Sequence, residues 1–474
     1  GRELVDRWVA ENKIIYGVTT GFGALCQTAI SPRDTKQLQK NIIMSHSSGV
    51  GRPLPEDVVR AVMAIRVHDL ALGYAGIRPE PLHYLLAFLN AGVSPVVPEK
   101  GSVGASGDLA PTSHLALVLL GMGEAFYQGR RIPGDRALSA IGLPPLELEA
   151  GEGLALVNGT QVMTAIACLV LEDAERLAKA ADIACALSLE VLMGSDSEFD
   201  PRIHQIRPHP GQIAAAANMR RMTHNSEIIL SHRGCSRVQD AYTLRCSPQV
   251  HGASRNAIAH VKEVVEIEIN SCTTNPLIFP DTESFLLGGN FHGQPIALVM
   301  DYLGMALAEL GSVSERRVER LVNPQLSDLT PFLVNSNGLN SGYMIAQYTA
   351  AALVSENKVL AHPACVDSIP TSANKEDHVS MGTISARKCR EILDNTEHVL
   401  AVELLCGAQA MDLFRIDRPF TPGEGTRAAC RVIREHVPFL DQDRVISKDI
   451  EAVTALIRSG ELIAEVEKAI GVME

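Results

Sequence analysis

Long stretches with helical periodicity and almost no proline restrict what this chain can fold into. The first covers residues 153–195, which contain no proline and carry apolar residues at spacings of three and four. Similar runs cover residues 294–322, 341–361 and 383–414. Each run is much longer than the average globular helix of about 11 residues. Because long helices pack side by side, the sequence predicts a helical bundle.

The chain before residue 150 contains shorter helical patterns than the rest. Glycine and proline interrupt it repeatedly, as in YGVTTGFG, GVGRPLPED and NAGVSPVVPEKG. Between these breaks lie shorter helical patterns, such as residues 56–73. We therefore expect a mixed assembly of helices and loops in this part of the chain.

The predicted helices are apolar over most of their circumference and rich in Ala, Gly and Ser. Apolar residues make up 46% of the chain and aromatic residues only 4%, which favours helix packing over a β-sandwich. One bundle of such helices would leave apolar faces uncovered, so we expect subunits to pack together as a homo-oligomer. The net charge of −13, with Lys and Arg scattered, argues against a nucleic-acid partner.

The cysteines and the hydropathy indicate the compartment. Ten cysteines are spread singly with no CxxC pair, which argues against a disulfide framework and against a zinc site. No run reaches the roughly 18 uncharged apolar residues that a membrane span needs, and the first residues lack a signal-peptide pattern. We expect a cytoplasmic protein that makes no membrane contact.

The segment GSVGASGDLAPTSH, residues 101–114, places small residues before a predicted helix. It is not a P-loop, because Asp108 follows Gly107, and it lacks the G-x-S-x-G pattern of a nucleophile elbow. Ala105 and Gly107 are small enough for the Gly107 amide nitrogen to approach the Ala105 carbonyl carbon. If that attack occurs and two waters leave, one of them from the Ser106 side chain, the product is a five-membered ring with an exocyclic methylene.

Such a ring would be an electrophile, which the twenty side chains do not provide, and it would act as a cofactor made from the chain. The following helix holds Pro111 in its first turn, so the ring would lie at a helix N-terminus. The partial positive charge there favours negative charge on the ring oxygen. The alternative from spacing alone is a small-residue turn that caps a helix.

Eight further segments extend the pattern along the chain, namely YGVTTGFG, SHSSGVG, EGLALVNGTQ, VQDAYTLRCSPQVHG, NSCTTNPL, GGNFHGQP, SERRVERLVNPQ and VDSIPTSANKEDHVSMG. Together with residues 101–129 they resemble, in the same order, the aromatic amino acid ammonia-lyases and 2,3-aminomutases. In that family Ala-Ser-Gly cyclises to 4-methylideneimidazole-5-one (MIO). The resemblance implies that MIO forms autocatalytically from Ala105, Ser106 and Gly107, and that neither a metal nor a soluble cofactor is needed.

The resemblance also assigns roles to matching residues. Tyr16, in YGVTTGFG, matches the loop tyrosine that removes the substrate β-proton, a role that requires neighbours that lower its pKa. Asn158, in LVNGT, matches the asparagine that holds the MIO or the substrate carboxylate. Phe291, in GGNFHG, would wall the substrate pocket. Without the resemblance, each has an ordinary explanation: a buried tyrosine, a helix cap and a core phenylalanine.

Gln239, Tyr242 and Arg245 follow one another at spacings of three, which predicts one helix face or turn. The resemblance places Arg245 on the substrate carboxylate, which a guanidinium fork grips better than a lysine does. It also makes Tyr242 a catalytic residue and Gln239 a substrate-binding one. A surface salt bridge is the alternative for Arg245.

Two positions indicate which aromatic amino acid is bound. The pair Ser45-His46 matches histidine-specific members of the family, and Glu376 matches their acidic residue. A phenyl substrate would leave His46 and Glu376 without partners, at about 1–3 kcal/mol for each unsatisfied group. Thr19 and Lys375 depart from the pattern, since histidine-specific members more often carry asparagine and glutamine there. His46 is also shared with tyrosine aminomutases, so Glu376 discriminates more.

The resemblance therefore implies that L-histidine is converted to urocanate and ammonia. It also implies an all-α fold, with an N-terminal MIO-bearing region over residues 1–190 and a long central and C-terminal helical bundle over residues 191–474. The expected assembly is a homotetramer whose active sites draw residues from more than one subunit. One alternative is a tyrosine or phenylalanine lyase, or a 2,3-aminomutase, with the same prosthetic group. Another is a helical oligomer that keeps the fold only as a binding scaffold.

Overall fold

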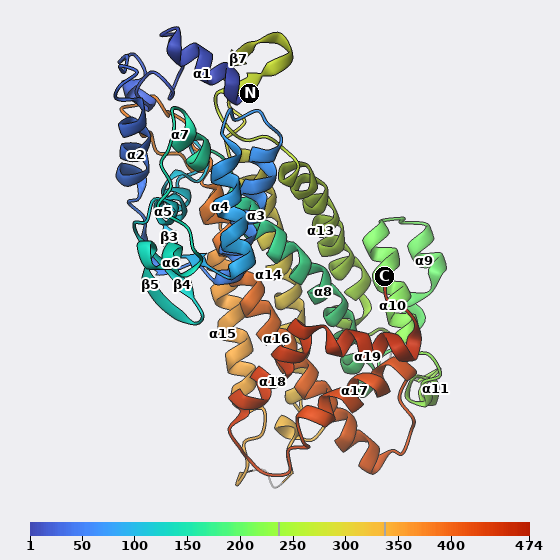
Figure 1. Ribbon diagram of the computed structural model, residues 1–474. Coiled ribbons are helices and arrows are strands. Elements are labelled where there is room, and N and C mark those ends of the chain that lie inside the picture. Colours follow the sequence, from blue (N-terminus) through green and yellow to red (C-terminus); the bar gives the residue numbers. More distant parts are fainter. Residues whose placement is uncertain (236–237, 336–337) are drawn as a thin grey trace. The chain divides into compact units, whose positions relative to one another are not determined.

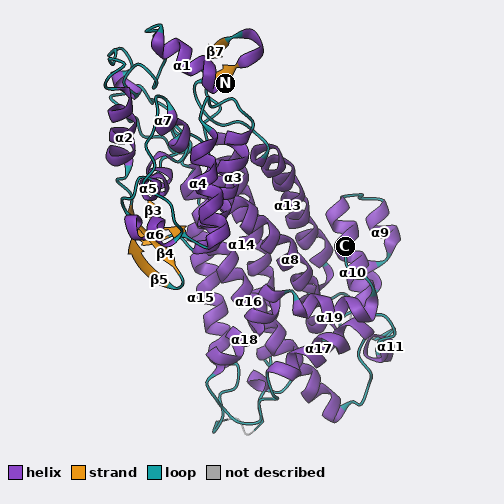
Figure 2. Cartoon of the chain, viewed as in Figure 1, coloured by secondary structure: helices purple, strands orange, loops and turns teal. Residues whose placement is uncertain are grey.

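The computed structural model of this chain describes residues 1–235, 238–335 and 338–474, and most of them are helical (Figure 1, Figure 2). The α-helices are α1 (Arg2–Ala10), α2 (Thr35–His46), α3 (Glu56–Ala71), α4 (Pro79–Ala91), α5 (Leu109–Leu119), α6 (Gly134–Ala140), α7 (Glu152–Val157), α8 (Gln161–Val191), α9 (Pro201–Gln205), α10 (Pro210–Met222), α11 (Glu227–Ser231), α12 (Tyr242–Arg245), α13 (Ser247–Ile269), α14 (Gln294–Val322), α15 (Met344–Leu360), α16 (Gly382–Asp417), α17 (Glu424–His436), α18 (Ile446–Ser459) and α19 (Glu461–Ile470). The predicted all-α class is confirmed.

The β-structure is short and antiparallel. Strand β1 pairs with β3, β4 lies between β2 and β5, and β6 pairs with β7. The strands are β1 (Val50–Pro53), β2 (Ser94–Pro95), β3 (Pro98–Lys100), β4 (Glu124–Tyr127), β5 (Arg130–Pro133), β6 (Leu277–Phe279) and β7 (Ser284–Leu286). Single 3-10 turns are η1 (Gly23–Leu25), η2 (Ser197–Phe199), η3 (Pro280–Thr282) and η4 (Pro331–Leu333).

The chain forms two compact units. The first comprises Gly1–Leu169, Lys262–Asp301 and Pro363–Arg387, and the second comprises Val170–Val261, Tyr302–His362 and Lys388–Glu474. The helices α8, α13, α14 and α16 contribute residues to both. Each unit is thus assembled from three chain segments, and the division into residues 1–190 and 191–474 stays a prediction.

The predicted long helices are present, with one exception. The runs at 294–322, 341–361 and 383–414 correspond to α14, α15 and α16. Helix α14 is long and apolar enough to cross a membrane, but 67% of its most apolar stretch is buried inside the protein. The prediction of one unbroken helix after residue 150 was wrong, because α7 ends at Val157 and α8 begins at Gln161.

Gly159 explains the break between these two helices. Its φ of +130° lies outside helical conformations. A Cβ on Gly159 would lie 2.6 Å from Gln161 Oε1 and 2.6 Å from Thr273 Oγ1, so a larger residue would not fit. The chain therefore leaves the helix at Asn158, and this bend brings Asn158 and Gly159 against the Ala-Ser-Gly segment.

The side chain of Asp108 caps the N-terminus of α8. Its carboxylate Oδ2 accepts the amides of Val162 at 3.0 Å and Met163 at 2.9 Å, so it caps α8 although it precedes α5 in the chain. The other oxygen accepts the hydroxyls of Ser102 and Thr383. Burial raises the pKa of this fully buried carboxyl, and the four donors oppose that rise.

We expect Asp108→Asn to lower the free energy of unfolding by about 2 kcal/mol, because one amide oxygen cannot replace two carboxylate oxygens that accept four hydrogen bonds. Urea denaturation measures this. The control Asp281→Asn, at an exposed position in η3, should change stability by less than about 0.5 kcal/mol. Equal effects of the two changes would contradict the capping role.

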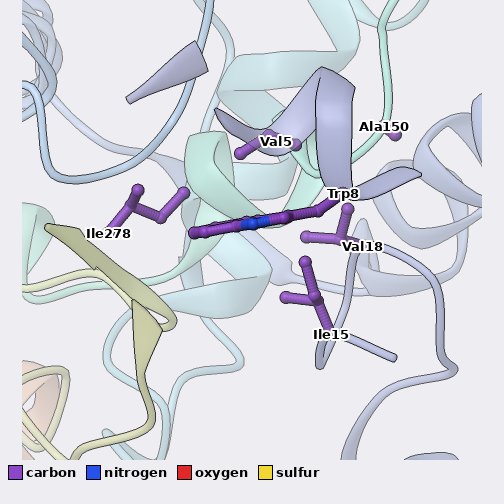
Figure 3. Packing of buried hydrophobic residues seen from close by; sticks show 6 residues of the cluster. All are labelled: Val5, Trp8, Ile15, Val18, Ala150 and Ile278. Atoms are coloured by element: carbon purple, nitrogen blue, oxygen red, sulfur yellow. The ribbon is translucent and has the colours of Figure 1, made fainter. Parts of the chain in front are cut away.

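The single tryptophan anchors the base of the loop that carries Tyr16. Ile15 and Val18, on either side of Tyr16, lie against one face of the Trp8 indole, and Val5 lies against the other (Figure 3). Ala150 and Ile278 belong to the same buried cluster. Trp8 is only 3% exposed. This cluster fixes both ends of the short segment from which the Tyr16 side chain extends.

The second unit contains a buried ion pair. The guanidinium of Arg317 donates to Glu403 at 2.5 Å and 2.9 Å, and both side chains are fully buried. Ser188 and Ser314 each donate to the same carboxylate at 2.7 Å. Because every carboxylate oxygen is hydrogen-bonded, the desolvated charges are compensated. Arg317 also donates to the carbonyl of Thr243 at 3.3 Å, which ties α12 to this core.

Candidate active site

Five of the residues predicted from the sequence line one cavity in the first unit. The cavity has a volume of about 580 Å³. The five residues are Tyr16, His46, Ser106, Asn158 and Glu376. They come from positions spread over most of the chain, and the fold brings them together. Apolar side chains such as Leu38, Ile42 and Leu154 complete the wall, so the cavity suits a small molecule with both apolar and polar parts.

The Ala105-Ser106-Gly107 segment lies in a tight turn. Ala105 and Gly107 are buried, and Ser106 is half-buried at the cavity. Gly107, with φ of +71°, forms a parallel bridge with Gly159. A Cβ on Gly107 would overlap the carbonyl of Gly159. The Asp108 amide donates to that same carbonyl at 2.7 Å. Both glycines are therefore required for this close backbone contact.

These residues fit the prosthetic group that the resemblance implies. The segment combines small flanking residues with a turn held by Asp108 and Gly159. Asn158 Nδ2 lies 3.5 Å from the carbonyl oxygen of Ser106, and the buried Asn158 Oδ1 has no hydrogen-bond partner among the described residues. A polar atom buried in this way favours a further ligand. The position of Asn158 is therefore compatible with the role that the resemblance gives it.

Tyr16 points its hydroxyl back at its own loop. Its Oη accepts the amide of Gly23 at 3.1 Å. Burial raises the pKa of Tyr16, the nearby charge of Glu376 raises it further, and the Gly23 hydrogen bond opposes both. Within the single chain these contacts raise the Tyr16 pKa overall, so they do not supply the lowering that a role as base requires. The phenol therefore loses its proton more readily as the pH rises.

His46 and Glu376 supply the polar end of the cavity. His46 closes α2, and its Nδ1 lies 3.0 Å from Ser45 Oγ. Burial lowers the pKa of His46, which favours the neutral imidazole at pH 7. Glu376 Oε1 accepts the hydroxyl of Ser106 at 3.2 Å, and Oε2 accepts that of Thr371 at 2.8 Å. The carboxylate thus lies directly at the Ala-Ser-Gly segment.

The two departures from the histidine-specific pattern lie outside the cavity lining in the part of the chain that the structure describes. Thr19 is buried within residues 16–30, the loop that begins at Tyr16, and its hydroxyl donates to the carbonyl of Lys13 at 2.7 Å and accepts the amide of Ile15 at 2.9 Å. Lys375 is exposed. Neither side chain alters the polarity of the cavity wall in the first unit.

The other predicted site residues lie elsewhere. Phe291, half-buried before α14, is not among the described residues that line this cavity. Tyr242 and Arg245 form α12 in the second unit, while Gln239 lies in the loop before it, so the prediction of one shared turn holds for two of the three. The Arg245 guanidinium lies 5.0 Å from the Tyr242 ring centre. Tyr242 is 71% exposed.

Sequence reasoning missed some residues that shape the site. Arg66 on α3 is fully buried and donates to the carbonyl of Asn158 at 2.8 Å, which fixes the end of α7. A charged residue within the apolar periodicity of residues 56–73 was the available signal. Ser372 lines the cavity, and its hydroxyl accepts the amide of Ala24. It belongs to the segment VDSIPTSANKEDHVSMG, in which the resemblance gives a substrate-binding role only to Glu376. No group of three or more His, Cys, Asp or Glu residues suited to a metal occurs in the described ranges.

Comparison with known proteins gives a consistent result. The sequence model of the aromatic amino acid lyase family matches residues 1–435. Histidine ammonia-lyase from Alkaliphilus oremlandii is 57% identical over 99% of this chain and 92% of its own length. Histidine ammonia-lyase from Caldanaerobacter subterraneus subsp. tengcongensis is 56% identical, covering 100% of this chain and 92% of the relative.

Solved structures resemble the whole chain. The crystal structure of histidine ammonia-lyase from Trypanosoma cruzi superposes with a TM-score of 0.91 at 44% identity, covering 99% of this chain and 88% of the other. Tyrosine aminomutase from Streptomyces globisporus superposes with a TM-score of 0.93 at 40% identity, covering 100% of this chain and 93% of the other. The fold is thus shared by proteins that act on different aromatic amino acids.

Proposed function

The chain belongs to the aromatic amino acid lyase family, and we propose that it eliminates ammonia from L-histidine to give urocanate. The observation that carries this proposal is that Glu376 lies against Ser106, in a cavity also lined by Tyr16 and by His46, whose pKa is lowered by burial. The relatives from Alkaliphilus oremlandii and Caldanaerobacter subterraneus subsp. tengcongensis, each more than half identical to this chain, are named histidine ammonia-lyases, which supports the same substrate.

The prosthetic group is part of the proposal. MIO formed from Ala105, Ser106 and Gly107 supplies an electrophilic methylene, so that no soluble cofactor is needed. Asn158, fixed from behind by Arg66, holds its side-chain amide at this segment. Tyr16 receives the β-proton of the substrate at its phenolate oxygen.

Imidazole recognition follows from the polar groups of the cavity. A neutral imidazole substrate has one N–H donor and one nitrogen acceptor. The Glu376 carboxylate can accept from the donor. His46, oriented by Ser45, can donate a hydrogen bond to the acceptor nitrogen of the substrate ring. A phenyl ring would make no hydrogen bond with either side chain, so the cavity favours histidine over phenylalanine.

The complete enzyme is proposed to be a cytoplasmic homotetramer. The second-unit residues Gln239, Tyr242 and Arg245, together with Phe291, would complete sites shared between subunits, with Arg245 gripping the substrate carboxylate. Large apolar side chains exposed on α15 support subunit packing, because Ile345 is 60%, Tyr348 64% and Val359 69% exposed in the single chain.

A substrate panel tests this function. Purified protein is given histidine, tyrosine and phenylalanine, and the absorbance of urocanate, coumarate and cinnamate is followed. We expect urocanate from histidine. Coumarate or cinnamate as the main product would indicate a tyrosine or phenylalanine lyase instead, and a β-amino acid would indicate an aminomutase. No turnover of any aromatic amino acid would favour a binding scaffold.

Glu376→Gln tests the imidazole contact. We expect kcat/KM for histidine, relative to that for phenylalanine, to fall about 10- to 100-fold, because an amide replaces the carboxylate that accepts the imidazole N–H. The ratio does not depend on how much of the protein carries MIO. Lys375→Gln, at the neighbouring exposed position, is the control and should leave the ratio unchanged. An unchanged ratio in Glu376→Gln would remove Glu376 from substrate recognition.

The pH dependence follows from the Tyr16 phenol. Because burial raises its pKa, the phenol is mostly protonated at neutral pH, and the fraction of phenolate rises as pH rises toward that pKa. We expect log kcat to increase with pH between about pH 7 and 9. Stopped assays across this range measure it. A rate that falls as pH rises through this window would exclude a Tyr16 phenolate as the base.

A further inference from the structure

The turn that carries Glu376 has an unusual backbone. Three successive residues with side chains, Ser372, Ala373 and Asn374, have φ of +52°, +52° and +64°. Left-handed backbone is unfavourable for residues with a Cβ and persists only where other contacts hold it. Here Thr371 and Glu376 close the turn, with the Thr371 amide donating at 3.0 Å and the Glu376 amide at 3.3 Å to each other's carbonyls.

This backbone aims Ser372 at the tyrosine loop, which we define as residues 16–30. The Ser372 Oγ accepts the amide of Ala24 at 3.2 Å. A Cβ on Gly23 would overlap the same hydroxyl, so the two segments are in direct contact there. The turn therefore touches the loop at Ser372 and touches Ser106 at Glu376.

The same part of the tyrosine loop holds the Tyr16 hydroxyl. The amide of Gly23 donates to Tyr16 Oη at 3.1 Å, and the next amide, that of Ala24, donates to Ser372. The loop tip itself is exposed, with Leu25 67% exposed and Ala24 also exposed. A tip with so little buried surface depends on specific polar contacts to stay in place.

We propose that Ser372 is a positioning residue that ties the tyrosine loop to the Glu376 turn and so places the Tyr16 hydroxyl in the cavity. The assignment rests on the proposed function for its catalytic consequence. Ser372 acts through the loop backbone rather than on the substrate. The left-handed turn has a role on this account, because it directs the hydroxyl toward the Ala24 amide.

Three variants separate the hydroxyl from the backbone conformation. Ser372→Ala removes the acceptor. Ser372→Gly also removes it but relaxes the left-handed backbone, so this variant keeps the test valid if the alanine variant folds poorly. Ala373→Gly is the matched control, since it relaxes the neighbouring residue of the same turn and keeps the hydroxyl.

Two measurements are made on the whole enzyme. The first is hydrogen exchange of the amides within residues 17–30, followed by mass spectrometry. We expect exchange in this loop to become about 3- to 10-fold faster in both Ser372 variants and to stay unchanged in Ala373→Gly. The second is steady-state kinetics with histidine. The Ser372 variants should lose about 3- to 10-fold in kcat with KM nearly unchanged, because the substrate loses no contact.

Wild-type loop exchange and wild-type kcat in both Ser372 variants would overturn the proposal. Slower catalysis in Ala373→Gly equal to that in Ser372→Ala would also overturn it, since the effect would then come from the backbone of the turn. A different result is expected if the protein does not have the proposed activity. In that case the wild type produces no urocanate, while the loop exchange still reports whether Ser372 holds the loop.

Discussion

Ser106→Ala is expected to leave a folded protein whose kcat is lowered at least about 1,000-fold. Alanine has no hydroxyl to leave as water, so the ring cannot gain its methylene and the site lacks its electrophile. The remaining side chains of the cavity can still bind substrate. The measurement is urocanate formation by the purified variant, together with circular dichroism to show that the helical fold is intact.

Ser113→Ala is the matched control for this change. Ser113 lies on α5, fully buried, and its hydroxyl donates to the carbonyl of Leu109 at 2.6 Å within the same helix. Its loss should leave kcat within about two-fold of the wild type, since a neutral hydrogen bond within a helix contributes little. If Ser106→Ala retained activity close to that of the control, the chemistry assigned to residues 105–107 would be wrong.

Tyr16→Phe is expected to lower kcat about 100- to 10,000-fold, the range for the loss of a positioned general base. Among the hydrogen bonds described for it, the hydroxyl accepts the amide of Gly23, so its removal also costs the loop one hydrogen bond, an effect smaller than the loss of the base. The KM for histidine should change far less than kcat, because the phenol acts on the β-proton. Steady-state kinetics over a range of pH measures both, and the rise of kcat with pH should disappear.

Tyr84→Phe provides the comparison. The Tyr84 hydroxyl donates to the carbonyl of Pro144 at 2.9 Å, in the same unit and away from the cavity lining in the described residues. Removing it should reduce stability by about 1 kcal/mol without lowering kcat. A loss of activity in Tyr84→Phe as large as that in Tyr16→Phe would mean that Tyr16 contributes to packing rather than to proton transfer.

The spacing of apolar residues predicts the long helices, but it does not predict where the backbone turns between helices. Helices α14, α15 and α16 follow from apolar spacing because burial of one face repeats along each of them. The break between α7 and α8 depends on Gly159 meeting Gly107, and on Asp108 capping a helix that begins far along the chain. Such contacts between distant segments leave no local pattern in the sequence.

The sequence predicted which residues line the site, but it did not predict how their pKa values shift. The resemblance selected Tyr16, His46, Ser106, Asn158 and Glu376, and these residues line one cavity. The direction of the Tyr16 pKa shift depends on burial and on the distance to Glu376, which exist only in the folded chain. The same holds for Ser372, because its contact with Ala24 spans 348 positions of the sequence. The roles of Gln239, Tyr242, Arg245 and Phe291 stay predictions.

The mass of one tryptic peptide tests the central claim most directly. Cleavage after Lys100 and Arg130 releases residues 101–130, which contain the whole Ala-Ser-Gly segment. Cyclisation between Ala105 and Gly107 with dehydration of Ser106 predicts a peptide lighter than its sequence by two water molecules, with the loss confined by fragmentation to residues 105–107. An active wild-type protein whose peptide has the full unmodified mass would contradict the account.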